Sequence, residues 1–513
     1  MTTPALSELL SDAGVDARRL RHALALLADG RWWTVGDLVR ETATSRRTVE
    51  ALLRTVELDH EGDRFRLTRS ERYDDQALAD PVGHLLAAHA ETVASMERLI
   101  ARGPRGRARL DHVSATAETV VRRALLLGAR FWLPGSRILF VGDHDLTSVA
   151  VSMIHPEAEV LVVDIDDRIL RYIAEVTRDA VTCRWADLRL GLAPSAAGWA
   201  DLTVTDPPYS PGGVGLFLAR SAEALRDREH GRLVLAYGVS ERTPALALKV
   251  QETIVGLNLA TEAMWPDFNR YHGAQAIGSA ADLYVLRPTS KTWPAIAGLP
   301  ERLAIYTQGP QSVESTAHAG TPLGTDLVDF LKPSLLVGDW PPGDLPRTRL
   351  STWLARPFAA DVDRVAVAVP AGLTAAFPRL LLASRSPHVD VVSTEPVSDL
   401  GFLSSVYKFA GVPGRLSAVR LPRPDPATPE AIVRRVLDNA HGKVPNNLRE
   451  GLIAYVRATG GSLTKNQARA LVAECAPWAE GATALELPLH RLRELPEVVA
   501  HLIERLTAGS GDG

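Results

Sequence analysis

The tetrapeptide Asp206-Pro207-Pro208-Tyr209 directly follows an apolar run at residues 202–205. Two consecutive prolines, each with φ fixed near about −65°, stiffen this turn and hold the flanking side chains in place. A carboxylate oxygen accepts N–H bonds from an amine, and an aromatic ring contacts a developing cation. The motif therefore predicts alkyl transfer to an amine nitrogen that Asp206 and Tyr209 orient, against the plainer interpretation of a proline-rich turn without chemistry.

Acidic residues gather at the ends of two earlier apolar runs. Gly142 to Asp145 end one run, and Asp164 to Asp167 end the next. Ligands of open parallel α/β sheets bind beyond the carboxyl ends of the strands, so both groups are expected at one site. A single Asp at a strand end is more often a helix cap, but six carboxylates between residues 143 and 167, Glu157 included, favour a functional site.

The spacing of these acids favours a nucleoside cofactor. Gly142 would let the backbone approach a ligand, and the helix starting near Leu146 would offer its amides. Asp164, about twenty residues further on, would accept the ribose hydroxyls. The pyrophosphate-binding GxGxxG pattern is absent, and carboxylates would repel a pyrophosphate. We therefore expect a cationic cofactor.

A cationic cofactor suggests roles for the other acids near these strand ends and for His144. Asp143, Asp145 and Asp166 are expected to lie beside the cationic parts of the ligands. His144 is a candidate proton acceptor, because an ordinary imidazole titrates near neutral pH.

The predicted site also includes Asp187 and Pro207, and it contains no metal. Asp187 follows a third apolar run, within reach of an adenine edge, and Pro207 is also predicted to contact the cofactor. No catalytic metal is expected, because His144 and His155 lack a convincing ligand spacing.

Strand and helix patterns alternate from residue 137 to about residue 288. This alternation predicts a mostly parallel sheet covered on both faces, in a Rossmann-like, class I methyltransferase-type catalytic domain at residues 131–290. Residues 73–130 form a predicted helical connector, and residues 426–513 a helical carboxyl-terminal region. Residues 300–425 alternate again, beginning with the predicted strand 303–307. Because residues 335–339 echo 139–143, a degenerate duplicate of the first domain is one interpretation of this second α/β domain.

Residues 1–72 are predicted to form a winged-helix-like domain. Residues 34–57 suggest two short helices around a turn, with Thr34 and Ser45 as N-caps, and residues 58–68 suggest a hairpin. Arg46 and Arg47 open the second helix, where DNA could be contacted. The helix is otherwise nearly neutral, so a packing or dimerisation module is the favoured alternative, and we also expect a homodimer.

Composition limits the classes of protein that the sequence can encode. The chain has 513 residues, 46% hydrophobic and 23% charged, which predicts a globular protein of roughly three domains. A net charge of −4 and a pI near 6.4 disfavour general nucleic-acid coating. Cys183 and Cys475 lie far apart, which disfavours a disulfide framework. With no signal-peptide pattern or long apolar window, we expect a cytoplasmic protein.

Together these motifs resemble the branched-chain polyamine synthase, or bis(aminopropyl)spermidine synthase, family over about residues 20–288. Its Gly-Asp-Asp-Asp motif falls on Gly142 to Asp145, and its Asp-Pro-Pro-Tyr motif on Asp206 to Tyr209. The resemblance implies a winged-helix-like domain and an aminopropyltransferase that uses decarboxylated S-adenosylmethionine, a spermidine-like acceptor and no metal. His144 departs from the family pattern, and nothing in that pattern explains residues 300–513.

The charge of the substrates gives a reason for so many acids. Decarboxylated S-adenosylmethionine and a polyamine are both cations, and carboxylates lower their mutual repulsion. One rival is an S-adenosylmethionine-dependent methyltransferase acting on an amino group of a DNA base or a small amine, since it can carry the same tetrapeptide. The other is a non-catalytic DNA-binding regulator that senses a polyamine or nucleoside.

Overall fold

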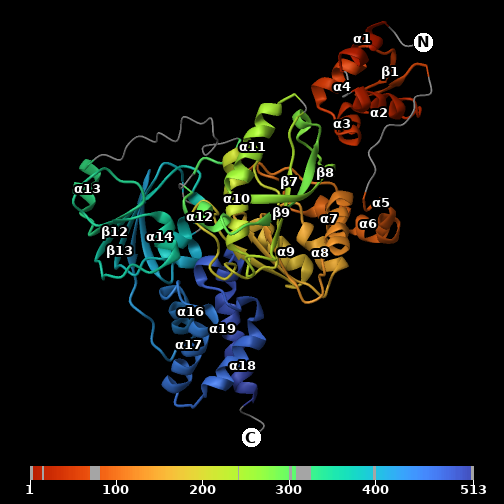
Figure 1. Ribbon diagram of the computed structural model, residues 1–513. Helices are drawn as coiled ribbons and strands as arrows, with labels where there is room; N and C mark the ends of the chain where they lie inside the picture. Colours follow the sequence, from red (N-terminus) through yellow and green to blue (C-terminus); the bar gives the residue numbers. More distant parts are fainter. Residues whose placement is uncertain are drawn as a thin grey trace.

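The computed structural model describes residues 4–13, 17–69, 81–240, 242–299, 303–307, 325–396 and 400–509 (Figure 1). Its helices are α1 (Pro4–Asp12), α2 (Ala17–Leu27), α3 (Val35–Thr42), α4 (Arg46–Leu53), α5 (Gly83–Leu86), α6 (Ala90–Arg102), α7 (Ala117–Arg130), α8 (Thr147–Ile154), α9 (Asp167–Thr177), α10 (Pro211–Glu223), α11 (Pro244–Gly256), α12 (Thr292–Ala297), α13 (Thr325–Leu331), α14 (Leu350–Ala355), α15 (Phe377–Leu382), α16 (Pro429–Asp438), α17 (Val444–Ala458), α18 (Lys465–Cys475) and α19 (Leu489–Gly509). None of the helices in these ranges is long and apolar enough to cross a membrane.

The domain predicted at residues 131–290 is built on a seven-stranded sheet. Its strands are β3 (Arg137–Val141), β4 (Glu159–Asp164), β5 (Val181–Trp185), β6 (Leu202–Thr205), β7 (Arg232–Tyr237), β8 (Leu259–Arg270) and β9 (Ala280–Pro288), in the order β5-β4-β3-β6-β7-β9-β8. β9 is antiparallel to β7 and β8, and the other neighbours are parallel. The order reverses between β3 and β6, which creates the switch point where such sheets bind ligands. The predicted Rossmann-like α/β fold is confirmed.

Both faces of this sheet are covered, as its apolar strands require. In β3, Ile138 and Phe140 share a buried cluster with residues of α7, α8 and α9. Leu139 and Val141 belong to a second cluster with Phe217 of α10. Alternate side chains of one strand therefore pack into cores on opposite faces.

A second sheet contains β10 (Leu335–Val337), β11 (Arg347–Thr348), β12 (Arg364–Val369), β13 (His388–Ser393), β14 (Tyr407–Val412) and β15 (Arg415–Arg420). Its order, β11-β10-β12-β13-β15-β14, is that of the first sheet without a counterpart of β5, and the strand directions agree. Gly142 and Gly338 follow equivalent strands with φ of 74° and 92°, and each donates its amide to the neighbouring strand, at 2.8 and 2.9 Å. This correspondence is what a degenerate duplicate would show.

Residues 303–307 differ from the prediction, because they belong to neither α/β sheet. Ile305 and Tyr306 are instead buried in the cluster that also holds Leu139 and Val141. The Ser210 hydroxyl donates to the Ile305 carbonyl at 2.6 Å. The apolar residues that suggested a strand therefore fix this segment against the first sheet.

The carboxyl-terminal half packs on the β5 side of the seven-stranded sheet, and its helices α16 to α19 are the blue ones in Figure 1. Arg379 of α15 is fully buried, bonds the Asp167 carboxylate at 3.0 Å and lies 4.0 Å from the Trp185 ring. Arg184 of β5 donates to the carbonyls of Trp478 and Glu480, at 3.0 and 2.7 Å. Two buried arginines thus join the two halves of the chain.

The amino-terminal unit combines α1 to α4 with a hairpin of β1 (Leu58–Glu61) and β2 (Arg64–Leu67). Thr34 and Ser45 cap α3 and α4, accepting the Asp37 and Thr48 amides. This confirms both predicted N-caps and the hairpin.

Candidate active site

A cavity of about 470 Å³ opens at the switch point of the first sheet, beyond the carboxyl ends of β3, β4 and β6. Gly142, Asp164 and Asp206, which end or follow these three strands, all line it. Residues 305–307 supply another part of the wall, and the Asp111 carboxylate accepts the Thr307 amide at 2.7 Å. The volume falls within the range of small-molecule sites.

Carboxylates outnumber cationic groups around the cavity. Six carboxylates line it, against two guanidinium groups, those of Arg123 and Arg189, and two imidazoles. The carboxylates belong to Asp111, Asp143, Asp145, Asp164, Asp187 and Asp206. Such a surface attracts cations and repels anions.

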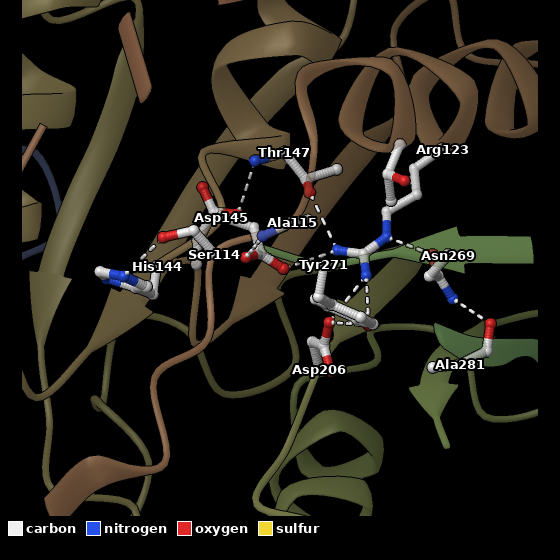
Figure 2. A network of polar contacts seen from close by, with 12 residues as sticks. Ser114, Ala115, Arg123, His144, Asp145, Thr147, Asp206, Asn269, Tyr271 and Ala281 are labelled. Atoms are coloured by element: carbon white, nitrogen blue, oxygen red, sulfur yellow. Dashed lines mark hydrogen bonds and ion pairs between the residues drawn. The ribbon is translucent and has the colours of Figure 1, made fainter. Parts of the chain in front are cut away.

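Arg123 of α7 lies at the centre of the polar network (Figure 2). Its guanidinium donates to Asp206 at 2.7 Å, to Asp145 at 3.0 Å and to the Asn269 side chain at 2.7 Å. Burial opposes its charge, but Tyr271, Asp206 and Asp145 raise the pKa of Arg123 above its usual range. The charge is therefore retained, and it joins α7, the turn after β3 and the turn after β6.

Two tyrosines hold the Asp206 carboxylate from its other sides. The Tyr209 hydroxyl donates to Oδ1 at 3.0 Å, and the Tyr271 hydroxyl donates to Oδ2 at 2.7 Å. Burial raises the pKa of Asp206 to about 6, although Arg123 and Tyr271 act in the opposite direction. Asp206 is thus ionised near neutral pH yet more basic than an ordinary aspartate.

The turn after β3 is stabilised by its own carboxylates. Asp143 accepts the amides of Thr147 and Ser148 at 2.9 and 3.2 Å, so the start of α8 does not offer these amides to a ligand as we had expected. Asp145 accepts the Ala115 amide at 2.8 Å in addition to Arg123. Both acids line the cavity, but each already has protein partners.

Asp164 also lines the cavity and accepts hydrogen bonds from backbone amides. Its carboxylate accepts the amides of Asp143 at 3.0 Å and Asp166 at 2.7 Å. Burial raises the pKa of Asp164 to about 6 and that of Asp143 well above its usual value. A bound cation would favour the ionised form of both groups.

Asp166 is absent from the residues that line the cavity. It caps α9 by accepting the Arg168 amide at 3.1 Å, and the Arg168 Nε donates to it at 3.0 Å. The structure therefore does not bring Asp166 to the predicted site.

His144 lies on the cavity wall, stacked against His112 with ring centroids 4.3 Å apart. Burial lowers the pKa of His144 to about 4, and burial followed by the proximity of His144 lowers that of His112 to about 3. Both rings are neutral at pH 7. The expectation that His144 titrates near neutral pH is wrong, because the ring is buried against a second imidazole.

Pro207 and Asp187 line the cavity as predicted, and Asp187 forms a buried ion pair with Arg189 at 2.6 Å. Sequence reasoning missed Arg123, Tyr271, His112 and Arg189. Arg123 had one signal in the sequence, because the arginine pair Arg122-Arg123 interrupts the apolar run of residues 120–127. None of the described residues forms a cluster of three or more potential metal ligands.

The strand order and the cavity at the switch point define the class: a Rossmann-like, class I methyltransferase-type domain. Residues 91–314 match the family model of the branched-chain polyamine synthase A C-terminal domain. The resemblance expected from the motifs is confirmed over this segment.

Three relatives overlap part of the chain. An uncharacterised protein of Methanocaldococcus jannaschii is 35% identical over 201 residues, which are 39% of this chain and 49% of that protein. The N(4)-bis(aminopropyl)spermidine synthase of the same organism is 23% identical over 48% of this chain and 75% of its own. That of Thermococcus kodakarensis is 27% identical over 39% and 62%. The chain spans about half the length of the first relative.

One solved structure aligns with more than half of the chain. The branched-chain polyamine synthase of Thermus thermophilus, solved with N4-aminopropylspermidine and 5'-methylthioadenosine, has 16% sequence identity and a TM-score of 0.43. The comparison covers 61% of this chain and 98% of that one.

Removing the charge of Arg123 should make stability strongly dependent on pH. Arg123→Met removes a neighbour that lowers the pKa of Asp206, so this pKa should rise above about 6. When the pKa of a carboxyl group is higher in the folded than in the unfolded protein, its protonation stabilises the folded state at low pH. This contribution to the free energy of unfolding is lost as pH rises through the folded-state pKa. The unfolding midpoint of Arg123→Met, measured by thermal melts, should therefore fall more steeply than that of the wild type between about pH 5 and pH 8.

Arg123→Lys is the matched control, because it keeps a positive charge beside the two carboxylates. Its melting temperature should depend on pH much less than that of Arg123→Met. Equal pH dependence in Arg123→Met and the wild type would show that the ion pair does not control Asp206.

Proposed function

We propose that the cavity transfers the aminopropyl group of decarboxylated S-adenosylmethionine to a nitrogen of a spermidine-like polyamine, releasing methylthioadenosine. The observation that carries the proposal is the excess of carboxylates around a cavity that also contains the Asp-Pro-Pro-Tyr turn. Two relatives that are N(4)-bis(aminopropyl)spermidine synthases support the same reaction class. Two cations must meet for this reaction, and the six carboxylates would lower their repulsion.

The donor nucleoside would lie across the ends of β3 to β5. Gly142 and Asp143 would contact the donor at the end of β3, and Asp164, at the end of β4, would accept its ribose hydroxyls. Asp187, after β5, would face the base.

The acceptor amine would lie beside the turn after β6. Its neutral nitrogen attacks the aminopropyl carbon attached to sulfur, a C–N bond forms, and the C–S electron pair moves to sulfur. The sulfonium thereby becomes the neutral thioether of methylthioadenosine. Asp206 would orient the nitrogen and accept its proton, which suits a carboxylate whose pKa is raised to about 6. Tyr209 and Tyr271 would hold this carboxylate in place.

The donor and the products distinguish the reaction classes. The protein is incubated with spermidine and either decarboxylated or intact S-adenosylmethionine, and the products are identified by mass spectrometry. We expect methylthioadenosine and an aminopropylated amine from the decarboxylated donor. Methylated amine and S-adenosylhomocysteine, without methylthioadenosine, would establish the methyltransferase instead.

Asp206→Asn should lower kcat about 100-fold or more, because the proton acceptor is lost while the side-chain volume is kept. Asp227→Asn is the control, since Asp227 is exposed and does not line the cavity. Equal activities of Asp206→Asn and the wild type would remove Asp206 from the proposed mechanism.

We infer that the amino-terminal unit is a winged-helix-like packing module. Ala43, Thr44 and Ser45, in the turn between α3 and α4, are buried. A Cβ on Gly278 would lie 2.7 Å from the Ala43 carbonyl carbon, so this turn packs directly on the loop after β8. The Arg46 guanidinium donates to the Gln275 side chain of the same loop. The start of α4, where a recognition helix would meet DNA, therefore faces the catalytic-type domain.

The packing interpretation predicts that the protein does not retain duplex DNA in a gel-shift experiment at low salt. Low salt favours phosphate contacts, so it gives DNA binding its best chance. Retention by the wild type that is lost in Arg47→Ala, which changes an exposed arginine near the start of α4, would contradict this interpretation.

A further inference from the structure

Asp206 has one open side, although protein donors surround most of its carboxylate. Its side chain is 19% exposed and lines the cavity. Among the described residues, Oδ2 accepts hydrogen bonds from Arg123 and Tyr271, whereas Oδ1 accepts only the one from Tyr209. A carboxylate oxygen can accept two hydrogen bonds, so Oδ1 retains an acceptor position. An amine nitrogen in the cavity would therefore bind at Oδ1.

An amine beside an isolated carboxylate is a poor nucleophile. A negative charge within hydrogen-bond distance favours the ammonium form of the amine, and an ammonium nitrogen has no lone pair with which to attack carbon. The reactive state therefore has no extra proton on either the nitrogen or Asp206. The carboxylates that gather around this cavity would work against that state, because their field attracts protons.

Arg123 supplies a charge that opposes the extra proton (Figure 2). Its guanidinium is 4% exposed and lies between Asp206 and Asp145, at 2.7 and 3.0 Å. A positive charge at this distance lowers the affinity of a pair of Asp206 and an amine for a proton, whichever member of the pair holds it. Burial strengthens the effect, because little water lies between the charges to screen them.

The other groups around Asp206 do not supply this charge. Burial raises the pKa of the Tyr209 and Tyr271 hydroxyls well above the usual value, so both remain neutral donors. Asp145 acts against Arg123, because its negative charge attracts a proton to Asp206. In the described part of the chain, Asp206 therefore faces a cation on α7, an acid after β3, a neutral hydroxyl after β8 and another in its own turn.

We propose that Arg123 is a positioning residue for proton transfer, whose charge keeps Asp206 and the acceptor nitrogen free of an extra proton until the C–N bond forms. The nitrogen attacks with its lone pair, and the proton that it loses on forming the C–N bond passes to Asp206. This inference rests on the proposed aminopropyl transfer, and it concerns a residue that need not contact either substrate. It also gives a reason for a guanidinium in a cavity lined mainly by carboxylates.

The pH dependence of aminopropyl transfer tests the proposal. Single-turnover rates at saturating decarboxylated S-adenosylmethionine and spermidine report the chemical step, and in the wild type they should rise with pH to a plateau. In Arg123→Met, this rise should move to higher pH by about one unit or more. The half-saturating spermidine concentration of Arg123→Met should not increase, because the cavity becomes more negative. In Asp145→Asn, the rise should move to lower pH, because a charge that attracts the proton is lost.

Arg123→Lys and Arg122→Met are the controls, and all rates are measured below the melting temperature of each variant. Arg123→Lys keeps the positive charge, so its rise should stay near the wild-type pH even where the plateau rate is lower. Arg122 precedes Arg123 on α7, is also buried and lies 4.5 Å from the Phe268 ring, but it does not line the cavity. Arg122→Met should therefore also leave the pH of the rise unchanged.

The proposal is overturned if Arg123→Met lowers the rate by the same factor at every pH, or if Asp145→Asn leaves the pH of the rise unchanged. Asp145→Asn decides the question alone if Arg123→Met does not fold. No transfer by the wild type at any pH would instead contradict the proposed aminopropyl transfer, on which the role of Arg123 rests.

Discussion

Arg123 is a buried cation held between Asp145 and Asp206, which follow different strands of one sheet. A charge taken out of water requires paired partners, so α7, the turn after β3 and the turn after β6 must all be correctly placed. Tyr271 and Asn269 of the β8–β9 region complete the same network. Because Asp206 belongs to this network, its orientation and basicity depend on the packing of the whole domain.

The seven-stranded sheet does not form the cavity alone. Residues 305–307 line one wall, the loop after β8 lines another and supports the amino-terminal unit, and the second sheet holds Arg189 through Gly372. The second sheet has the strand order of the first without the outermost strand. The two sheets differ after their first strands. In the first sheet, β3 and its turn lead into α8, whereas in the second sheet β10 and its turn are followed by Trp340 and Pro341.

Much of the site was predictable, because parallel strands bring their carboxyl ends to one edge. This rule was enough to bring Asp164, Asp187 and Asp206 to one cavity. It did not reveal Arg123 or Arg189, whose roles depend on contacts between residues far apart in the chain. The local sequence also could not distinguish an acid that faces a cavity from one that caps a helix, and Asp166 is such a cap. Nor could it show that burial keeps His144 neutral.

We propose that the carboxylates around the cavity select a donor without a carboxylate of its own. Calorimetric titration of the wild-type protein with decarboxylated and with intact S-adenosylmethionine, at equal pH and salt, tests it most directly. The two ligands share the nucleoside and the sulfonium, so their affinities differ through the carboxylate alone. We expect the decarboxylated form to bind at least about tenfold more tightly, since a partly buried like-charge contact costs on the order of 1 to 2 kcal/mol. Equal affinity, or tighter binding of the intact form, would contradict it.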